Sequence, residues 1–377
     1  MSEWRACTKI LCIRPDNMGD LVMTGPALRA LKETFKCHIT LLTSSRASPM
    51  VAFMPEIDEV LVFDLPWVKT DHQPDQSYTN RIVNSIKERR FDAGIIFTVY
   101  SQSSLPAALL LYMAAVPRRL AYSRENPYDL LTHWFPDPEP YSCIKHQVKR
   151  DLDLVAFVGA TTTRAGLKLV PRPVFDIKRI LAVCGVDPLR KWLIIHTGVS
   201  EEKREYPVAD WVQLIRLLEK ETEYQLVMTG TANERNGNEK IIKAADGKRV
   251  YNLAGSIDLN EFIQLIKAAP LVITVNTSTS HIAAAMETPL LVLYALTNPQ
   301  HFPWQGKGRV LLYDIEPLQR SRNEVIRFVH QYLHPVDVPV PEPAVLLKAV
   351  LEIVAGNVSG IPELPQLRRY PGESEQG

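Results

Sequence analysis

Short apolar runs rich in β-branched residues alternate with helix-like stretches along this sequence, and the alternation occurs twice. The first half carries KILCIR (9–14), HITLLTS (38–44), EVLVFD (59–64) and AGIIFT (93–98). The second half carries WLIIHTG (192–198), YQLVMTG (224–230), LVITVN (271–276) and LLVLYA (290–295). Strands that alternate with helices pair in parallel, so the pattern predicts an α/β protein with two Rossmann-like, doubly wound domains.

The length of 377 residues also favours two domains over a single core. A proline-containing stretch at 171–191 separates the two sets of strands and marks the junction. We expect an N-terminal domain over residues 1–178, a C-terminal domain over 179–356 and a flexible tail over 357–377. Ligands of doubly wound sheets bind at the carboxyl ends of the strands, so the loops that follow the strands are the places to search.

The overall charge and the cysteines restrict the class of protein. A formal net charge of +1 gives no general attraction to nucleic acid. The five cysteines are scattered without a C-x-x-C pair, which favours free thiols over disulfides or a zinc site. The N-terminus lacks a secretory signal, and the longest apolar run, at 106–116, is too short for a bilayer and predicts a buried helix. We expect a cytoplasmic protein, with peripheral contact to a membrane left open.

The loop after the first strand reads Arg14-Pro-Asp-Asn-Met-Gly-Asp20. The helical spacing of the apolar residues that follow predicts a core-packed helix. Pro26 favours a regular helix that begins with Thr24 as its cap, which leaves Asp20 in an irregular segment before it. Asp20 is then either a simple capping residue or a general base for an attacking hydroxyl, and its position alone does not decide. Gly19 either supplies a turn or lets a ligand approach the backbone closely.

Two loops in the second half suit phosphate groups. The first contains the hydroxyl and glycine residues Thr197, Gly198 and Ser200 and the cations Lys203 and Arg204, which would hold a diphosphate or else form a solvated charged loop. The other loop opens a helix with Asn276, Thr277, Ser278, Thr279, Ser280 and His281. One hydroxyl is enough to cap a helix, so the surplus favours an anion at the helix N-terminus.

Several common nucleotide and metal motifs are absent from the sequence. Neither G-x-x-x-x-G-K-[ST] nor G-x-G-x-x-G occurs, which disfavours a P-loop enzyme and a standard dinucleotide enzyme. The D-x-D motif of Asp151 and Asp153 lies in a helical pattern, where residues two apart diverge and cannot clamp one metal ion. We therefore expect neither a metal nor another cofactor, with phosphate charge handled by cations and dipoles.

These loops, in this order, resemble glycosyltransferase family 9, the ADP-heptose:lipopolysaccharide heptosyltransferases. The segment ILCIRPDNMGDLVMTGPALRALKETF is similar to the family's N-terminal signature, and HQVKRDLDL, LVMTGTANER, YNLAGSIDLNEFIQLIKAA and HIAAAMETPLLVLYALTNP extend the likeness to about residues 8–305. The resemblance implies a GT-B fold, with two Rossmann-like domains facing a central cleft. It implies an acceptor on the first domain and a sugar nucleotide, with ADP as the expected nucleotide, on the second.

The resemblance also implies roles for single residues. Asp20 matches the catalytic aspartate of an inverting, metal-independent transfer. Arg204, with Lys203 beside it, matches a cation that contacts the donor phosphates. Glu234 matches a glutamate near the nucleoside, and residues 277–281 match the loop that grips the diphosphate.

This sequence departs from the family pattern mainly on the donor side. The family has D-[ST]-G-[PL]-x-H where residues 276–281 read NTSTSH, and G-P-T-D-P where residues 295–299 read ALTNP. These changes remove two glycines and two acids, so they bear on the nucleotide and the sugar more than on the fold or the reaction class.

The acceptor is expected to be a glycolipid or glycan such as a lipopolysaccharide core. Arg14 and Gly19 lie beside Asp20, and a basic patch of Arg118, Arg119, Arg124, Lys145 and His146 would hold its phosphates and carboxylates unless these side chains are merely solvated. Two alternatives remain open at this point. The chain could be a nucleotide-sugar epimerase with the same two-domain build, or a non-catalytic homologue that only binds sugar nucleotides.

Overall fold

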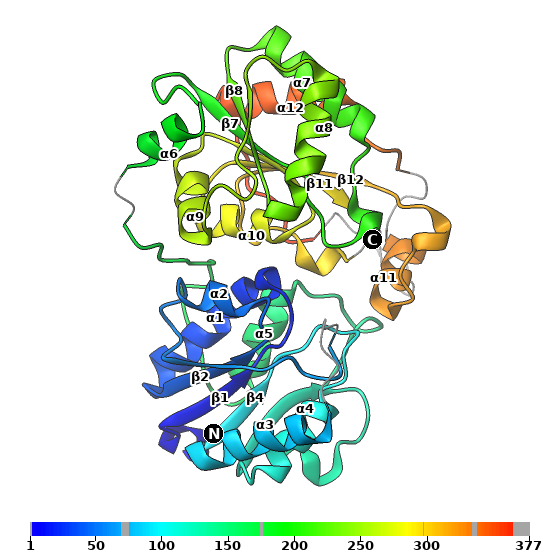
Figure 1. The fold of residues 1–377 in the computed structure, drawn as a ribbon. Coiled ribbons are helices and arrows are strands. Elements are labelled where there is room, and N and C mark those ends of the chain that lie inside the picture. Colours follow the sequence, from blue (N-terminus) through cyan, green and yellow to red (C-terminus); the bar gives the residue numbers. More distant parts are fainter. Residues whose placement is uncertain (1, 69–74, 174–175, 297, 334–337, 365–377) are drawn as a thin grey trace. The chain divides into compact units, whose positions relative to one another are not determined.

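Two six-stranded parallel sheets account for the double alternation in the sequence, as a computed structural model of the chain shows (Figure 1). The structure describes all residues except 1, 69–74, 174–175, 297, 334–337 and 365–377. The chain divides into two compact units, Met1–Val170 and Pro171–Gly377, each with its own sheet. The division falls at the start of the proline-containing stretch, whereas the sequence placed the domain boundary at residue 178.

The sheet of unit 1 has the strand order β3-β2-β1-β4-β5-β6, with every pair parallel. Its strands are β1 (Lys9–Ile13), β2 (His38–Thr43), β3 (Glu59–Val62), β4 (Ala93–Ile96), β5 (Arg118–Ser123) and β6 (His133–Pro136). Its helices are α1 (Met18–Phe35), α2 (Ser48–Val51), α3 (Gln76–Arg89), α4 (Leu105–Met113) and α5 (Gln147–Ala156), with 3-10 turns η1 (Ser2–Ala6) and η2 (Tyr128–Leu130).

The sheet of unit 2 has the order β12-β11-β10-β7-β8-β9 and is also parallel throughout. Its strands are β7 (Trp192–His196), β8 (Gln225–Thr229), β9 (Val250–Asn252), β10 (Val272–Val275), β11 (Leu290–Ala295) and β12 (Gly308–Tyr313). Its α-helices are α6 (Ile177–Val183), α7 (Val208–Glu221), α8 (Arg235–Ala245), α9 (Leu259–Ala268), α10 (Ser278–Ala285), α11 (Glu324–Phe328) and α12 (Pro343–Val354). The shorter helices are η3 (Glu202–Arg204), η4 (Ala232–Glu234), η5 (Pro299–His301), η6 (Pro317–Gln319) and the π-helix η7 (Val329–Leu333).

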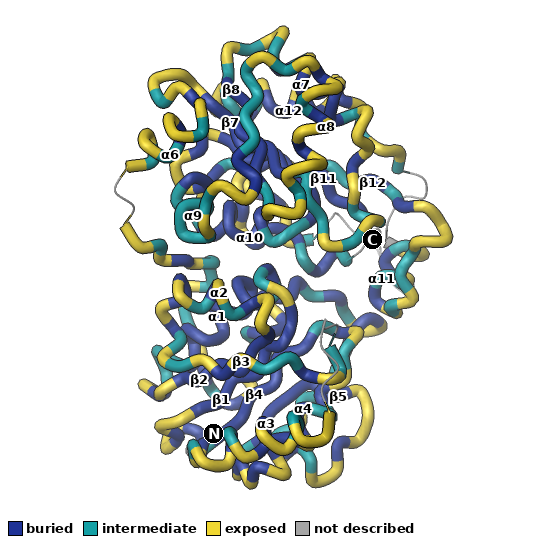
Figure 2. Tube along the Cα trace, viewed as in Figure 1, coloured by how far each residue is buried: buried dark blue, intermediate teal, exposed yellow. Residues whose placement is uncertain are grey.

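All eight strands predicted from the apolar runs are present, and the α/β class of two doubly wound sheets is confirmed. The central strands of both sheets are buried on both faces (Figure 2), as parallel strands covered by helices must be. Each sheet has two further strands that the sequence reading missed, β5 and β6 in unit 1 and β9 and β12 in unit 2. These lie toward sheet edges, where a strand is short or begins with charged residues and leaves a weak apolar signal.

Helix α1 begins earlier than predicted. The sequence reading placed its start at Thr24, but the helix begins at Met18, so Asp20 lies in its first turn and Pro26 in its interior. The Thr24 hydroxyl is not a cap; it donates a hydrogen bond to the Asp20 carbonyl at 3.1 Å. A proline inside a helix costs one backbone hydrogen bond and about 3 kcal/mol. Burial of α1 over most of its length, from Leu21 to Leu31, offsets that cost.

Helix α4, predicted to be buried, is buried on one face only. Its Ala108 and Leu111 lie in the core of unit 1, whereas Leu109, Tyr112 and Met113 are about half exposed. Within the described part of the chain, no helix is both long enough and apolar enough to cross a bilayer.

The predicted tail over 357–377 is described only in its first part. Ile361 is buried there, and its backbone N–H donates to the Gly306 carbonyl at 2.8 Å. This segment is therefore attached to unit 2. The prediction for 365–377 lies outside the described residues.

Candidate functional site

Asp20 lies at the carboxyl edge of the unit 1 sheet, where β1 passes through a four-residue loop into α1. As the third residue of the helix it faces Asn17, whose backbone N–H points at Asp20 Oδ2 at 3.4 Å. The other carboxylate oxygen is 3.5 Å from Arg14 Nη2. Asn17 is the N-cap residue, and Asp20 is its partner in a capping box. Asp20 therefore has a part in the capping that was its alternative role, but the contact is long and weak. Its side chain keeps 15% exposure, so the carboxylate can meet a ligand.

Arg14 is fully buried and lies between two acids of the same loop. Its Nε is 3.0 Å from Asp16 Oδ2, and its Nη2 faces Asp20. Burial raises the pKa of Asp16 to about 6, although the Arg14 guanidinium lowers it and the nearby Asp20 carboxylate raises it further. Asp16 also accepts a hydrogen bond from the Gln102 side chain. The loop thus holds one permanently charged cation beside two carboxylates, and burial raises the pKa of one of them, Asp16.

Helix α5 supplies a third acid to this cluster. Asp151 is buried and accepts hydrogen bonds from Thr24 Oγ1 and Gln147 Nε2, both at 2.8 Å. Burial raises the pKa of Asp151, and the charge of Arg14 opposes the shift. Asp153 instead pairs with Lys145 at the surface, so the two acids of the D-x-D motif diverge as their helical spacing requires. The contact between Thr24 and Asp151 joins α1 to α5 and fixes the helix that carries Asp20.

Arg150, also on α5, anchors this helix to the loop after β6. Its guanidinium pairs with Asp137 at 2.6 Å and with Glu139 at 2.7 Å, and all three side chains are almost completely buried. The guanidinium also lies 4.1 Å from the centre of the Tyr122 ring. The sequence reading assigned no role to Asp16, Arg150 or Asp151. The similarity of HQVKRDLDL to the family was the only signal that could have drawn attention to the last two.

The structure does not bring the predicted basic patch together. Arg118 and Arg119 begin β5, at the amino edge of the sheet, opposite the edge that carries Asp20. Arg119 is buried and donates to the carbonyls of Val116, Asp129 and Leu130, so its guanidinium holds backbone in place.

Two other members of the predicted patch lie nearer the carboxyl edge. Arg124 follows β5, and its guanidinium lies 4.7 Å from the centre of the Tyr100 ring. His146 is buried and caps α5, because its Nδ1 accepts from the Val148 N–H at 3.1 Å. Of the acceptor residues predicted away from the first loop, Arg124 is therefore the exposed one at this edge.

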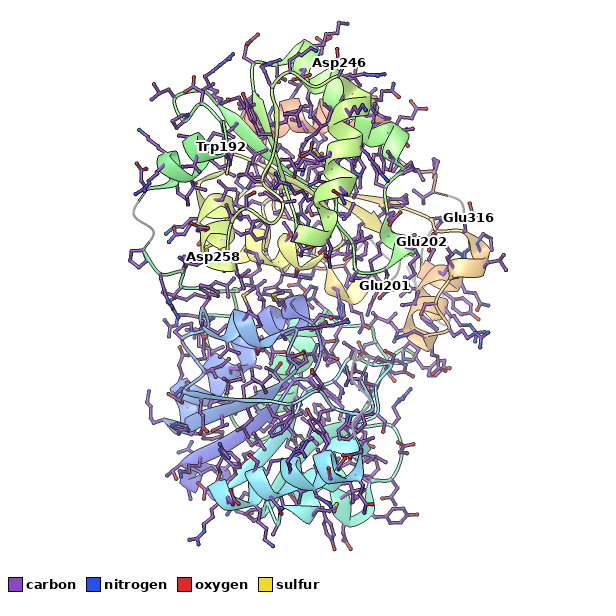
Figure 3. The ribbon with its side chains drawn as sticks, in the orientation of Figure 1. Trp192, Glu201, Glu202, Asp246, Asp258 and Glu316 are labelled. Carbon is purple, nitrogen blue, oxygen red and sulfur yellow. The ribbon has the colours of Figure 1, made fainter. Side chains whose placement is uncertain are left out.

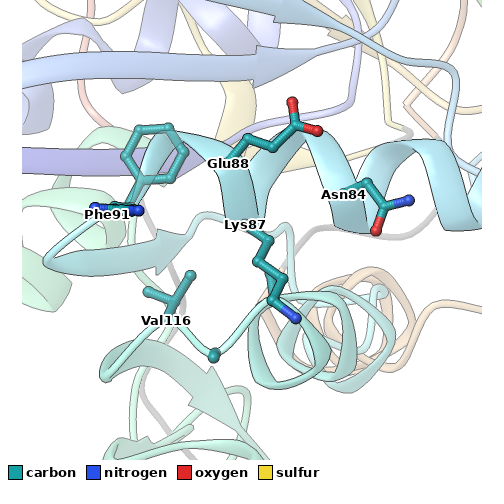
Figure 4. Close-up of a pocket in the computed structure, with 8 residues that line it drawn as sticks. Asn84, Lys87, Glu88, Phe91 and Val116 are labelled. Carbon is teal, nitrogen blue, oxygen red and sulfur yellow. The ribbon is translucent and has the colours of Figure 1, made fainter.

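A cavity of about 660 Å³ also opens at the amino edge of this sheet (Figure 4). Lys87 and Glu88 from the end of α3, together with Phe91 before β4 and Val116 before β5, line it. Ligands of parallel α/β sheets bind at the opposite, carboxyl edge. We therefore assign this cavity no part in the site.

In unit 2, the loop after β7 carries the two predicted cations. Lys203 Nζ is 2.8 Å from one oxygen of Glu201, and Arg204 Nη2 is 3.1 Å from the other. Figure 3 labels Glu201 and its neighbour Glu202 in this loop. The sequence reading did not anticipate that one carboxylate would hold both cations. Each cation keeps about a quarter of its side chain exposed, so an incoming anion could compete with Glu201 for both.

Glu234 lies against the glycines in the loops that follow β7 and β8. A Cβ added to Gly198 would meet Glu234 Oε1 at 1.8 Å, and one added to Gly230 would meet Oε2 at 2.8 Å. The Thr231 backbone N–H donates to Glu234 Oε2 at 2.6 Å and fixes the carboxylate there. Thr197 of the preceding loop donates to Asn238 of α8 at 2.9 Å. The predicted residues Thr197, Gly198 and Glu234 are thus brought together by two neighbouring strands.

The loop after β10 leads into α10, which begins at Ser278. Thr277 occupies the capping position, yet its side chain makes no capping hydrogen bond. The Ser280 hydroxyl donates to the Thr277 carbonyl at 2.8 Å. The inner members of the segment are buried, namely Asn276, Thr279, Ser280 and His281, whereas Thr277 and Ser278 are half-buried. Backbone N–H groups and hydroxyls therefore meet at a helix N-terminus beside β7, an arrangement that suits an anion.

Neither unit shows a metal site in its described part, because no three His, Cys, Asp or Glu side chains there are grouped so as to hold an ion. The site residues consist of a buried charge network in unit 1 and of glycine, hydroxyl and cation loops in unit 2. The first can hold or accept a proton, and the second can bind phosphate oxygens.

Comparison with known proteins gives one consistent result. The sequence model described as glycosyltransferase family 9 (heptosyltransferase) matches residues 79–327, more than half of the chain. Lipopolysaccharide heptosyltransferase 2 of Salmonella typhimurium is 24% identical over 321 residues, which cover 80% of this chain and 87% of that protein.

Two solved structures share the fold. A family 9 glycosyltransferase of Veillonella parvula aligns with a TM-score of 0.72 at 15% identity, covering 93% of this chain and 97% of the other. The ADP-heptose lipopolysaccharide heptosyltransferase II of Escherichia coli aligns with a TM-score of 0.68 at 20% identity, covering 93% and 99%. The predicted GT-B fold class is therefore confirmed.

Proposed function

Because this chain belongs to glycosyltransferase family 9 and is a glycosyltransferase, we propose that it transfers a heptosyl group from ADP-heptose to a lipopolysaccharide-core acceptor. Two of the relatives named above are heptosyltransferases of lipopolysaccharide, and one of these two is an ADP-heptose enzyme. The observation that carries the proposal is the arrangement of Asp20, a partly exposed carboxylate at the carboxyl edge of the sheet beside the buried Arg14. That arrangement suits a base that must remain ionised and reach a substrate.

The reaction is a single displacement at the anomeric carbon. Asp20 accepts the proton of the acceptor hydroxyl as that oxygen forms the new glycosidic bond. The bond from the anomeric carbon to the diphosphate breaks at the same time, and its electron pair leaves with ADP. Because the nucleophile enters opposite the leaving group, the configuration at the anomeric carbon is inverted.

Arg14 is a positioning residue in this scheme. Its guanidinium lies between Asp16 and Asp20 and is fully buried. A buried cation close to a carboxylate favours the ionised form, which is the form that can act as a base. The bond between Thr24 and Asp151 holds α1, and with it Asp20, in a fixed place.

Unit 2 would bind the donor. Lys203 and Arg204 would exchange part of their contact with Glu201 for the diphosphate, and the N-terminus of α10 would receive its oxygens. These groups stabilise the charge that develops on the departing ADP, so the proposal includes no metal ion or other cofactor. Glu234, fixed against Gly198 and Gly230, would contact the nucleoside.

The acceptor determines where the enzyme works. Lipopolysaccharide-core acceptors are glycolipids, so we place the reaction in the cytoplasm at the inner face of the membrane, with contact through the acceptor. Arg124 is the predicted acceptor residue whose exposure and position at the carboxyl edge suit such a ligand.

The decisive experiment combines the purified protein with ADP-heptose and a lipopolysaccharide core that lacks heptose. We expect the acceptor to gain one heptosyl unit by mass spectrometry, with one ADP released per unit and with activity unchanged by EDTA. NMR of the product should show an anomeric configuration opposite to that of the donor. If ADP-heptose were consumed without an acceptor product, the proposed transfer would be overturned. If EDTA abolished activity and Mg²⁺ restored it, the proposed independence of metal would be overturned.

An assay without acceptor tests the epimerase alternative. A transferase leaves the sugar nucleotide largely intact under these conditions, apart from slow hydrolysis. An epimerase would convert it to a second sugar nucleotide, which chromatography resolves. We expect no such product.

A further inference from the structure

A small cavity lies beyond the carboxyl ends of β11 and β12, apart from the loops assigned to the donor. Its volume is about 210 Å³. Arg320, Ser321, Arg327 and His330 line it together with Asp314 and apolar residues that include Ile315. We call it the Arg320 cavity. Three basic side chains and one acid therefore face this space. Leu296, directly after β11, is the one lining residue from a segment with a donor-side family motif.

Two nitrogen atoms of this cavity lack partners. Arg320 Nε and His330 Nε2 are buried from solvent, and neither has a hydrogen-bond partner among the described residues. The acid of the cavity is engaged elsewhere, because Asp314 Oδ2 accepts from the Val338 backbone N–H at 3.0 Å. Arg320 Nε is a donor, and a buried donor without an acceptor costs about 1–3 kcal/mol. An anion inside the cavity would remove this cost and would meet more positive than negative charge.

The Arg320 cavity lies close to the loop that carries Lys203 and Arg204 but is distinct from it. Tyr313, the last residue of β12, donates its hydroxyl to the carbonyls of Arg204 and Glu205 at 3.2 and 3.3 Å. Asp314 follows directly and lines the cavity. Neither Lys203 nor Arg204 is among the lining residues. The cavity is therefore a neighbour of the proposed donor site on the β12 side of the sheet.

We propose that the Arg320 cavity is a second anion site, which binds one phosphate-type oxyanion separately from the donor diphosphate. Arginine forks and a serine hydroxyl are the groups that recognise phosphate oxygens. The volume is below the roughly 300–1,000 Å³ of pockets that enclose whole ligands, so it suits a single charged group and not a sugar nucleotide. The anion is either free phosphate or a phosphate group on a saccharide. Only the second source rests on the proposed function.

The test measures phosphate binding to the full chain by titration calorimetry and ³¹P NMR, with the donor site saturated by ADP. We expect inorganic phosphate to bind the ADP-saturated protein. The double variant Arg320→Gln/Arg327→Gln should weaken this binding at least tenfold while ADP affinity stays within twofold. Arg322→Gln, an exposed neighbour that does not line the cavity, should leave both unchanged. Displacement of all bound phosphate by ADP would overturn the proposal, because the phosphate would then lie in the donor site.

A milder variant and a second ligand complete the experiment. Should the double variant fail to fold, as judged by its thermal unfolding, His330→Gln removes the imidazole that lines the cavity and should weaken phosphate binding severalfold; unchanged binding in that variant would also overturn the proposal. Glucose 6-phosphate serves as a simple phosphorylated saccharide. Binding at least tenfold tighter than inorganic phosphate identifies a saccharide phosphate as the source, whereas equal or weaker binding identifies free phosphate. Both results are separate from the heptosyl-transfer assay, so the cavity and the proposed function can fail independently.

Discussion

The carboxyl edges of the two sheets differ in how far their charged residues are buried. In unit 1, Arg14, Arg150 and Asp151 are almost completely buried; Arg14 pairs within its own loop, whereas Arg150 and Asp151 of α5 are tied to the loop after β6 and to α1. In unit 2, Lys203 and Arg204 lie on a partly exposed loop and share a single acid only a few residues away. The first edge is a rigid charge network made by tertiary contacts, and the second is a set of local loops.

This difference matches the two tasks of a glycosyl transfer. A base needs a fixed position and a defined ionisation state, which buried, charged neighbours supply. A diphosphate arrives and leaves in every cycle, so its binding groups must remain accessible and exchange partners easily. The comparison predicts that substitutions in unit 1 affect rate and stability strongly, whereas those in the unit 2 loops change affinity by smaller amounts.

The largest effect is expected for Asp20→Asn. The amide still accepts from the Asn17 N–H, so the first turn of α1 is kept, but it cannot take a proton. Transfer measured with ADP-heptose and core acceptor should fall about 10²- to 10⁴-fold in kcat/KM, with ADP affinity within a few fold. Asp153→Asn, a partly exposed acid on α5, serves as the control and should remain active. A rate close to wild type for Asp20→Asn would refute the assignment of the base.

Arg150→Met tests the rigidity of the unit 1 edge. It leaves Asp137 and Glu139 buried without their cation, and breaking a buried pair in this way costs about 3–5 kcal/mol. Urea unfolding should show that loss. Arg190→Met removes an exposed arginine paired with Glu223 in unit 2 and should change stability by less than about 1 kcal/mol. If both variants lost the same free energy of unfolding, the proposed difference in rigidity between the two sheet edges would be contradicted.

Asp16→Asn should change how stability depends on pH. The folded-state pKa of about 6 lies above the ordinary value of 3.8, so the folded protein binds this proton more tightly than the unfolded chain does. That stabilisation is complete below about pH 4 and is lost as the pH rises through 6. Between about pH 4 and pH 8, the free energy of unfolding of the wild type should fall by up to about 3 kcal/mol more than that of Asp16→Asn, as urea unfolding can measure. Asp129→Asn changes an exposed acid, so its free energy of unfolding should depend on pH as that of the wild type does. If the curve of Asp16→Asn ran parallel to that of the wild type, the raised pKa of Asp16 would be refuted.

The smallest effect is expected for Glu201→Gln, which should increase the affinity for ADP. It releases Lys203 and Arg204 from partly exposed ion pairs that are worth at most about 1 kcal/mol. ADP should therefore bind up to about fivefold more tightly at low salt, and less so at high salt, as calorimetry can measure. Glu202→Gln, an exposed neighbour, should bind ADP as wild type does. Weaker ADP binding by Glu201→Gln would show that Glu201 orients the cations instead of competing for them.

Some features of the site could be found from the sequence because they are local. Eight strands, the loop that holds Asp20 and the phosphate-type loops of unit 2 each occupy one short segment, and their periodicity or composition is visible there. The start of α1 was misjudged because a proline was taken to mark a helix start, and tertiary burial tolerates it inside the helix. The placement of Arg118 and Arg119 at the edge opposite Asp20 could not be foreseen, because a cation in a sequence does not reveal at which end of its strand it will lie.

The sequence by itself determined the class of fold, the family resemblance and the identity of the candidate base, since each depends on short patterns that survive without knowledge of contacts. Only the tertiary structure decided what surrounds that base. Thr24 and Asp151 are 127 residues apart along the chain, yet 2.8 Å separate their side-chain oxygens. Arg150 likewise acquires Asp137 and Glu139 as partners, and Asp16 acquires Gln102, only when the chain folds, because burial and pairing between separate segments are properties of packing and not of local sequence.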